Sequence, residues 1–179
     1  MFIRETMARA APLTAVPGWG GVAMGVTALL AAWFAARRTA PAEWLAVWLA
    51  EAVVALGIGG AALIRKAQQS DQPALARAGR QFAGNFAPPI AAGMFLTPAF
   101  YQAGLVNHLP GLWLLLYGTA VTTAGAFSIR VIPLMGICFM ALGGVALAVA
   151  PAGRDVFMAA GFGGLQIAFG LLIARRYGG

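Results

Sequence analysis

The chain has 179 residues, of which 61% are hydrophobic and only 9% are charged, and its formal net charge is +7. A soluble domain carries about 25% charged residues, so this composition excludes an ordinary soluble domain and predicts an integral membrane protein. The positive charge does not indicate nucleic-acid binding. The basic residues lie at the ends of apolar runs, and no basic patch is interleaved with aromatic residues.

Six apolar runs follow one another, each close to the roughly 20 residues that span about 30 Å of hydrocarbon. They cover 18–36, 44–64, 82–102, 111–129, 132–150 and 156–174. We therefore predict an all-α fold, in which 1–179 form one integral membrane domain, a polytopic bundle of about six transmembrane helices. Before the first run, residues 1–12 are expected to form either a short interfacial helix or a frayed tail.

Lysine and arginine residues predict the orientation of this bundle, because loops that stay in the cytoplasm are enriched in them. With the N-terminus inside, nine basic residues fall on the cytoplasmic side and three on the outer side. The nine are Arg4, Arg9, Arg65, Lys66, Arg77, Arg80, Arg130, Arg175 and Arg176, and the three are Arg37, Arg38 and Arg154. We therefore expect both termini to be cytoplasmic.

Glu51 lies well inside the second run and is the only acidic residue in any run. A carboxylate in hydrocarbon is costly and marks a candidate functional site, and desolvation favours its protonated form. Helical spacing places Trp44 and Trp48 on the same face as Glu51. Two aromatic rings and a carboxylate can hold an organic cation. The alternative is a structural, protonated carboxyl that is hydrogen-bonded to a threonine or a backbone carbonyl.

The third run is the least regular, because it contains Pro88-Pro89 and Pro98. Interior prolines remove backbone hydrogen bonds and kink helices. We expect Pro88-Pro89 to mark the first turn of this helix, or a break or a kink a few residues inside it.

The segment 65–80 precedes the third run and is the one sizeable segment that we expect outside the membrane. A short helix is predicted to start near Pro73, with Ser70 or Asp71 as its cap. The segment carries four basic residues, Arg65, Lys66, Arg77 and Arg80. It is expected to be an ordinary cytoplasmic loop, to attract anionic headgroups, or to contact a protein partner.

Small and polar residues in other runs predict close helix packing. Thr119, Thr122 and Thr123 share one face of the fourth run, and Gly21 and Gly25 lie about one turn apart on the first. Both patterns predict a seam where another helix approaches closely.

Gln166 lies near the middle of the sixth run, where a polar side chain usually bonds across helices, typically for about 1 kcal/mol or less. Together with Glu51 and Trp48 it forms the candidate intramembrane polar site. His108, in the loop after the third run, is expected to be solvated and without function. The single histidine and the single cysteine, Cys138, cannot build a metal cluster. The sequence contains no catalytic motif, so we expect no catalytic residue, no metal, no cofactor and no enzymatic activity.

Four segments resemble uncharacterised small six-span bacterial membrane proteins. They are 110–118, 125–130, 157–165 and 174–179, which read PGLWLLLYG, GAFSIR, FMAAGFGGL and ARRYGG. The resemblance implies a multi-pass protein of a bacterial inner membrane and carries no activity with it.

These observations favour a non-enzymatic sensor, regulator or assembly partner in the inner membrane, which acts through helix packing and a protein contact at 65–80. The alternative is a small proton-coupled transporter for an apolar or cationic solute, with Glu51 as its protonation site. We favour the first, because transport normally needs more polar lining than Glu51, Gln166 and a threonine seam. The sequence indicates no particular substrate, partner or oligomeric state.

Overall fold

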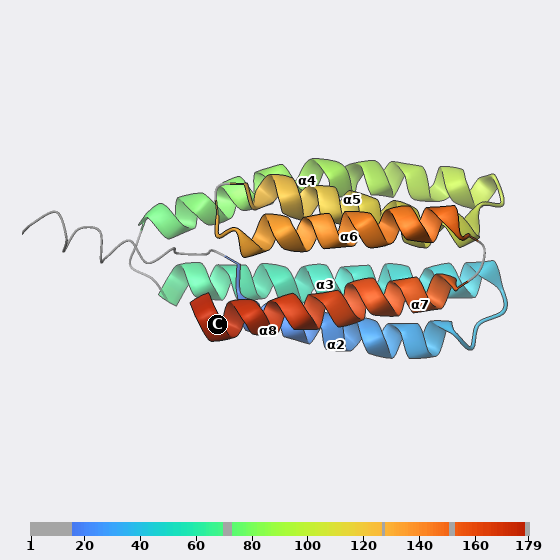
Figure 1. Cartoon of the computed structure of the whole chain (residues 1–179), viewed down its shortest axis with the longest axis horizontal. Helices are drawn as coiled ribbons and strands as arrows, with labels where there is room; N and C mark the ends of the chain where they lie inside the picture. The colour runs from blue at the N-terminus through green and yellow to red at the C-terminus, as the bar shows by residue number, and fades with distance from the viewer. Residues whose placement is uncertain (1–15, 70–72, 127, 151–152, 178–179) are drawn as a thin grey trace, which may run out of the picture.

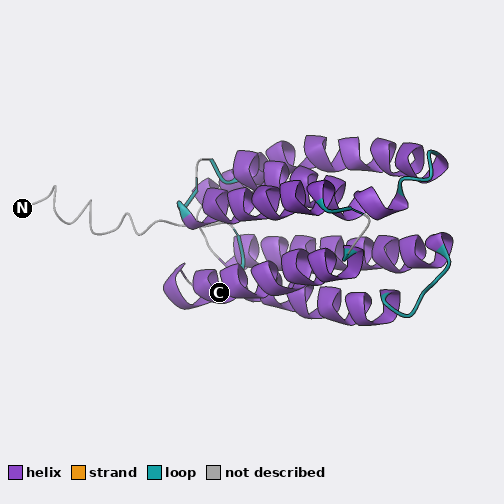
Figure 2. Cartoon of the chain, turned by 45° about the vertical axis from the view of Figure 1, so that its right-hand side comes forward, coloured by secondary structure: helices purple, strands orange, loops and turns teal. Residues whose placement is uncertain are grey.

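A computed structural model of the chain describes residues 16–69, 73–126, 128–150 and 153–177. These ranges are helical and contain no strand, which confirms the predicted all-α class for the described residues (Figure 2). The elements are α2 (Gly18–Ala35), α3 (Pro41–Gln69), α4 (Pro73–Gln102), the 3-10 turn η1 (Val106–His108), α5 (Leu109–Ala124), α6 (Val131–Ala148), α7 (Arg154–Met158), the π-helical η2 (Ala159–Leu165) and α8 (Gln166–Tyr177). The last three run on as one helix. The predictions for 1–12, Ser70 and Asp71 lie outside the described residues.

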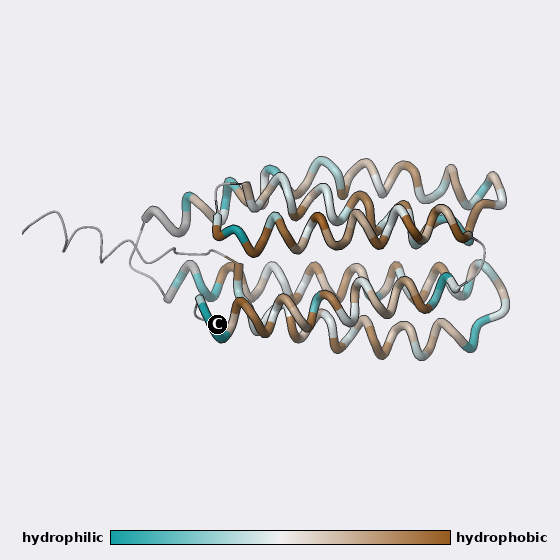
Figure 3. Tube along the Cα trace, viewed as in Figure 1, coloured by the Kyte–Doolittle hydropathy of each residue, from teal (hydrophilic) through white to brown (hydrophobic). Residues whose placement is uncertain are grey.

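Among the described residues, four helices are long and apolar enough to cross a membrane, as expected of a membrane protein. They are Gly18–Ala35, Pro41–Lys66, Val131–Ala148 and Arg154–Tyr177. Helices α4 and α5 lie alongside them in the bundle, but α5 has only 16 residues, and the first half of α4 carries several polar side chains. Hydrophobic segments fill the middle of the bundle, and hydrophilic ones gather near its two ends (Figure 3).

The helices run alternately up and down and form two groups (Figure 1). In the first group α2 packs against both α3 and α8, and in the second α5 packs against both α4 and α6. The chain therefore crosses between the groups twice, after α3 and after α6. Aromatic rings fill part of the boundary, where Tyr117 of α5 and Phe139 of α6 pack against Phe162 of η2.

Glycines spaced seven residues apart bring α5 and α6 together. Gly111 and Gly118 of α5 lie against Gly143 and Gly136 of α6. A Cβ atom at Gly118 would lie 2.6 Å from the carbonyl oxygen of Gly136, and one at Gly143 would lie 2.8 Å from the backbone nitrogen of Leu115. Only a hydrogen atom fits at such distances, so these glycines set the separation of the two helices.

The same spacing joins α2 to the last helix through Gly163 and Gly170. A Cβ atom at Gly21 would lie 3.3 Å from the Cα of Gly170, and one at Gly25 would lie 2.9 Å from the carbonyl oxygen of Gly163. The predicted close approach at Gly21 and Gly25 is therefore confirmed, and its partner is the C-terminal helix.

The predicted threonine seam divides between two neighbours. The hydroxyl of Thr122 donates to the carbonyl of Gly118 at 2.8 Å and lies where a side chain at Gly136 of α6 would have to go. The hydroxyl of Thr123 lies 3.3 Å from the carbonyl of Asn85 on α4. The threonine face of α5 thus packs against α6 at Thr122 and against α4 at Thr123.

The third helix is longer and more continuous than predicted. Helix α4 begins at Pro73, as expected, but runs unbroken through Pro88 and Pro89 to Gln102. A start or a break near Pro88-Pro89 is therefore wrong. Each proline removes only its own N–H donor, and the rest of the ladder and the contact with α5 hold the helix. Segment 65–80 is consequently not a free loop, because α3 continues to Gln69 and α4 starts at Pro73.

The fourth helix ends earlier than predicted. Helix α5 stops at Ala124 and not near 129, because the chain turns at Gly125. A side chain at Gly125 would collide with Ile132 of α6, so the turn is tight enough to require glycine there. Pro133 falls in the first turn of α6, where proline is favoured.

The same substitution at two adjacent glycines of α6 tests the close contact between α5 and α6. We expect Gly143→Ala to lower the free energy of unfolding by about 1–3 kcal/mol, because its methyl group has no space against α5. Gly144→Ala should leave stability unchanged or raise it slightly, since nothing lies within 4 Å of the added atom. Thermal unfolding in detergent measures both, and equal effects would contradict the proposed contact.

Candidate functional site

Glu51 lies on the side of α3 that meets α2 and is half-buried. Its Oε1 atom is 2.8 Å from the hydroxyl of Thr27, and that hydroxyl is also 2.9 Å from the backbone carbonyl of Met24. A hydroxyl has one proton to donate. The Thr27 hydroxyl can donate to Glu51, or it can accept from a protonated Glu51 and donate to Met24, so the pair can hold the carboxyl in either protonation state.

A groove of about 440 Å³ opens beside this pair, between α2 and α3. Its lining residues are Thr27, Leu30, Ala31, Phe34, Arg38, Val47, Ala50, Glu51 and Val54. Leu30, Phe34 and Val54 are 56%, 50% and 47% exposed, so the groove is an open surface feature and not an internal chamber. It is apolar along most of its length, with Arg38 and Glu51 as its ionisable groups.

The groove belongs to the most exposed of the four membrane-length helices. Only 6% of the residues in the apolar stretch of α3 are buried, against 33–39% in the other three. Cβ atoms built at Gly57 and Gly60 would meet nothing within 4 Å, unlike those at Gly118 of α5 and Gly136 of α6. Much of the membrane-length part of α3 therefore has no covering helix in the described residues.

Trp48 does not join Glu51 in this groove. Trp44 is fully buried and Trp48 is 3% exposed, and both belong to the apolar core that α2 and α5 help to form. The indole N–H of Trp48 has no hydrogen-bond partner in the part of the chain that the structure describes. The cation over the Trp44 ring is the chain's own Arg154, whose guanidinium carbon lies 4.8 Å from the ring centroid. The predicted combination of both rings with Glu51 is therefore not assembled.

Gln166 is buried, at 5% exposure, and lies apart from the groove. Its Oε1 atom accepts a hydrogen bond of 3.1 Å from the hydroxyl of Tyr117, which confirms the predicted bond across helices. The Tyr117 ring packs against Phe139 and Phe162, with centroids 4.8 and 5.2 Å away. This bond joins the two helix groups in the middle of the bundle, so the role it supports is structural.

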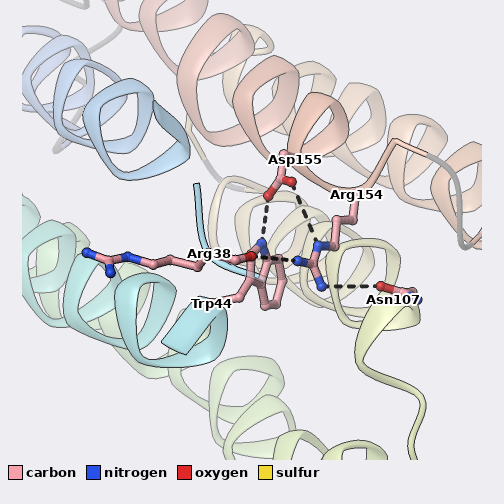
Figure 4. Close-up of polar contacts among 5 residues, drawn as sticks. All are labelled: Arg38, Trp44, Asn107, Arg154 and Asp155. Atoms are coloured by element: carbon pink, nitrogen blue, oxygen red, sulfur yellow. Dashed lines mark hydrogen bonds and ion pairs between the residues drawn. The ribbon is translucent and has the colours of Figure 1, made fainter. Parts of the chain in front are cut away.

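A second polar cluster, not predicted from the sequence, lies at the end of the bundle where α3 and α7 begin (Figure 4). The indole N–H of Trp44 donates to Asp155 at 2.6 Å, and Arg154 lies 3.7 Å from the other carboxylate oxygen of Asp155. Arg154 also donates to the side chain of Asn107 and to the backbone carbonyl of Arg38, each at 3.4 Å. One guanidinium thus ties together all three connections at this end of the bundle.

The tryptophans extend this cluster into the core. Trp113 stacks on Trp44 with centroids 5.9 Å apart and planes 8° from parallel, and its indole donates to Thr97 at 2.9 Å. His108, expected to be solvated, is instead half-buried, and its Nδ1 atom is buried without a partner among the described residues. The charged pair Arg154-Asp155 at the start of an apolar run was the sequence feature that could have indicated this cluster. The residues that the pair contacts come from distant segments, so the sequence did not identify them.

Comparison with known proteins adds no relative, since no protein-family model, no curated protein and no solved structure matches the chain. In the described residues, no group of three or more histidine, cysteine or acidic side chains is placed to hold a metal ion. The groove beside Glu51 is therefore the feature of the described structure that best fits a binding role.

Two arginines over tryptophan rings test the role of the polar cluster around Arg154. Arg154 covers the buried Trp44, and Arg37 covers the exposed Trp33. We expect Arg154→Gln to lower the free energy of unfolding by about 2 kcal/mol, and Arg37→Gln by about 0.5–1 kcal/mol, because the contact at Trp44 is desolvated. Thermal unfolding in detergent compares the two, and an equal loss would mean that Arg154 does not hold the connections at this end of the bundle together.

Proposed function

We propose that the chain is a six-span protein of a bacterial inner membrane with both termini in the cytoplasm. It acts without catalysis, as a regulator or assembly partner that binds a transmembrane helix of another protein along the groove between α2 and α3. The position of Glu51 in that groove, on the least-covered helix, carries the proposal. The resemblance to uncharacterised six-span bacterial proteins supports the choice of membrane.

The distribution of charge supports the orientation. In the described residues, seven basic side chains lie at the end where α3 and α8 finish and α4 and α6 begin, and three lie at the opposite end. A cytoplasmic side enriched in lysine and arginine is the usual arrangement. The alignment of α4 and α5 with the four apolar helices supports six spans.

The chemistry of the groove supports a helix as its occupant. A half-buried carboxyl at a lipid-facing surface is costly, and a partner that covers it and donates or accepts a hydrogen bond removes that cost. Small residues at Ala50 and Gly57 allow a second backbone to come close, as glycines do inside this bundle. The segment 65–80, where α3 ends and α4 begins, offers the same partner the exposed basic side chains of Arg65, Arg77 and Arg80.

A proton-coupled transporter is the alternative, with Glu51 exchanging protons. It is supported by the Thr27–Glu51 pair beside a groove of about 440 Å³, which is large enough for a small solute. We favour the assembly role for two reasons. The groove opens on the side of the bundle, between α2 and α3, and the Trp44 ring that could hold a cationic solute is already covered by Arg154.

Reporter fusions test the topology. A reporter inserted at Gly104, between α4 and α5, should lie on the outer side of the membrane, whereas one fused after Gly179 should lie in the cytoplasm, because the charge distribution directs both. Reporters on the same side of the membrane would contradict the six-span arrangement.

Photo-crosslinking tests the groove as a contact surface. A photoreactive amino acid at Val54, which lines the groove, should give a discrete protein adduct in native membranes. The matched position is Phe95 of α4, which is also exposed and does not line the groove, and it should give none. The same protein adducts from both positions would show that the groove is not a specific contact.

Two substitutions of Glu51 separate the assembly role from transport. Glu51→Gln keeps a hydrogen-bonding group and should preserve the adduct at Val54, whereas Glu51→Leu should weaken it about 3- to 30-fold, the equivalent of one membrane hydrogen bond of about 0.6–2 kcal/mol. A transporter would instead lose flux with Gln, because an amide cannot exchange a proton. Flux assays in liposomes with a pH gradient measure this. Wild-type flux that Gln abolishes would reverse our preference.

A further inference from the structure

The outward face of α8 carries a second groove, of about 400 Å³. Its lining consists of Ala168, Leu171, Leu172, Arg175 and Arg176. These positions follow helical spacing, so they form one continuous stripe along the last helix. The opposite face of the helix, with Gly170 and Ile173, is the one buried against the bundle.

The stripe is divided into an apolar part and a cationic part. Leu171 and Leu172 lie about one turn deeper in the helix than the two arginines, which are both exposed and lie in its last turn. No ion pair joins either guanidinium to an acid in the described part of the chain. The described acids, Glu43, Glu51 and Asp155, belong to other elements. The two positive charges are therefore available to a ligand at the end of the bundle.

We propose that this groove binds one anionic phospholipid, with its phosphate on Arg175 and Arg176 and an acyl chain along Leu172, Leu171 and Ala168. Guanidinium groups bind phosphate through paired N–H donors, and basic pockets beside transmembrane helices are known to hold acidic headgroups. From Arg176 to Ala168 the helix rises about 12 Å, which accommodates the first part of an acyl chain. A free phosphate ion would use the arginines but would gain nothing from the leucines.

Native mass spectrometry of the purified full-length chain tests this site. Phosphatidylglycerol and phosphatidylcholine with the same acyl chains are the probes, together with inorganic phosphate as a competitor. The wild type should bind phosphatidylglycerol at least tenfold more tightly than phosphatidylcholine. Arg175→Gln/Arg176→Gln should weaken phosphatidylglycerol about 30-fold, the loss expected for two basic residues near a headgroup.

Two further variants keep the test specific. Arg77→Gln/Arg80→Gln removes the same charge at the same end of the bundle but outside the groove, and should change affinity less than threefold. Ala168→Trp fills the apolar part without changing charge, and should weaken phosphatidylglycerol at least threefold while circular dichroism stays that of the wild type. Equal losses in the two arginine pairs, no effect of Ala168→Trp, or full competition by inorganic phosphate would each overturn the proposal.

Discussion

Backbone approach at glycine is the interaction on which the rest of this structure depends. In lipid, apolar side chains gain little by leaving their solvent for one another, so helices pair where their surfaces fit closely. Gly118 meets Gly136 in the α5–α6 pair, and Gly25 meets Gly163 in the α2–α8 pair. Helix α3 contributes no comparable contact at Gly57 or Gly60, which remain open. The glycine contacts that hold the α5–α6 and α2–α8 pairs together therefore leave part of the surface of α3 available for contact with another molecule.

Two polar contacts then hold the pairs in a single bundle. Tyr117 and Gln166 bond in the middle, and Arg154 ties Trp44 to the connections at the end where α3 and α7 begin. Both contacts satisfy their groups inside the chain, which is why Gln166 has a structural role in this account. Glu51 differs, because its only described side-chain partner is Thr27 and its groove is open. That contrast directs the functional hypothesis to α3.

Local patterns in the sequence predicted the helical class, the apolar runs and the bond made by Gln166, because each depends on residues within one helix or on the cost of a polar group in lipid. Of the outcomes expected at Pro88-Pro89, a start or a break of α4 did not occur, because neighbouring packing outweighs the lost donors. The contact of Arg154 with Trp44 was not predicted, since it joins segments more than a hundred residues apart. The seven-residue spacing of glycines was visible in the sequence and marks packing faces, but it does not say which helix meets which.

Whether water reaches the groove between α2 and α3 distinguishes a surface that binds another helix from a path for a solute. Ala50→Cys, in a chain with Cys138→Ser, places a thiol in the groove, and Thr39→Cys places one in the exposed connection between α2 and α3. The measurement is the rate at which a charged, membrane-impermeant maleimide labels each thiol in intact membranes. A groove that faces lipid or a partner helix predicts rapid labelling at Thr39→Cys and none at Ala50→Cys until the chain is denatured, because only a hydrated thiol forms the reactive thiolate. Labelling of Ala50→Cys by the charged reagent at a comparable rate would show a water-filled path to Glu51 and contradict the account.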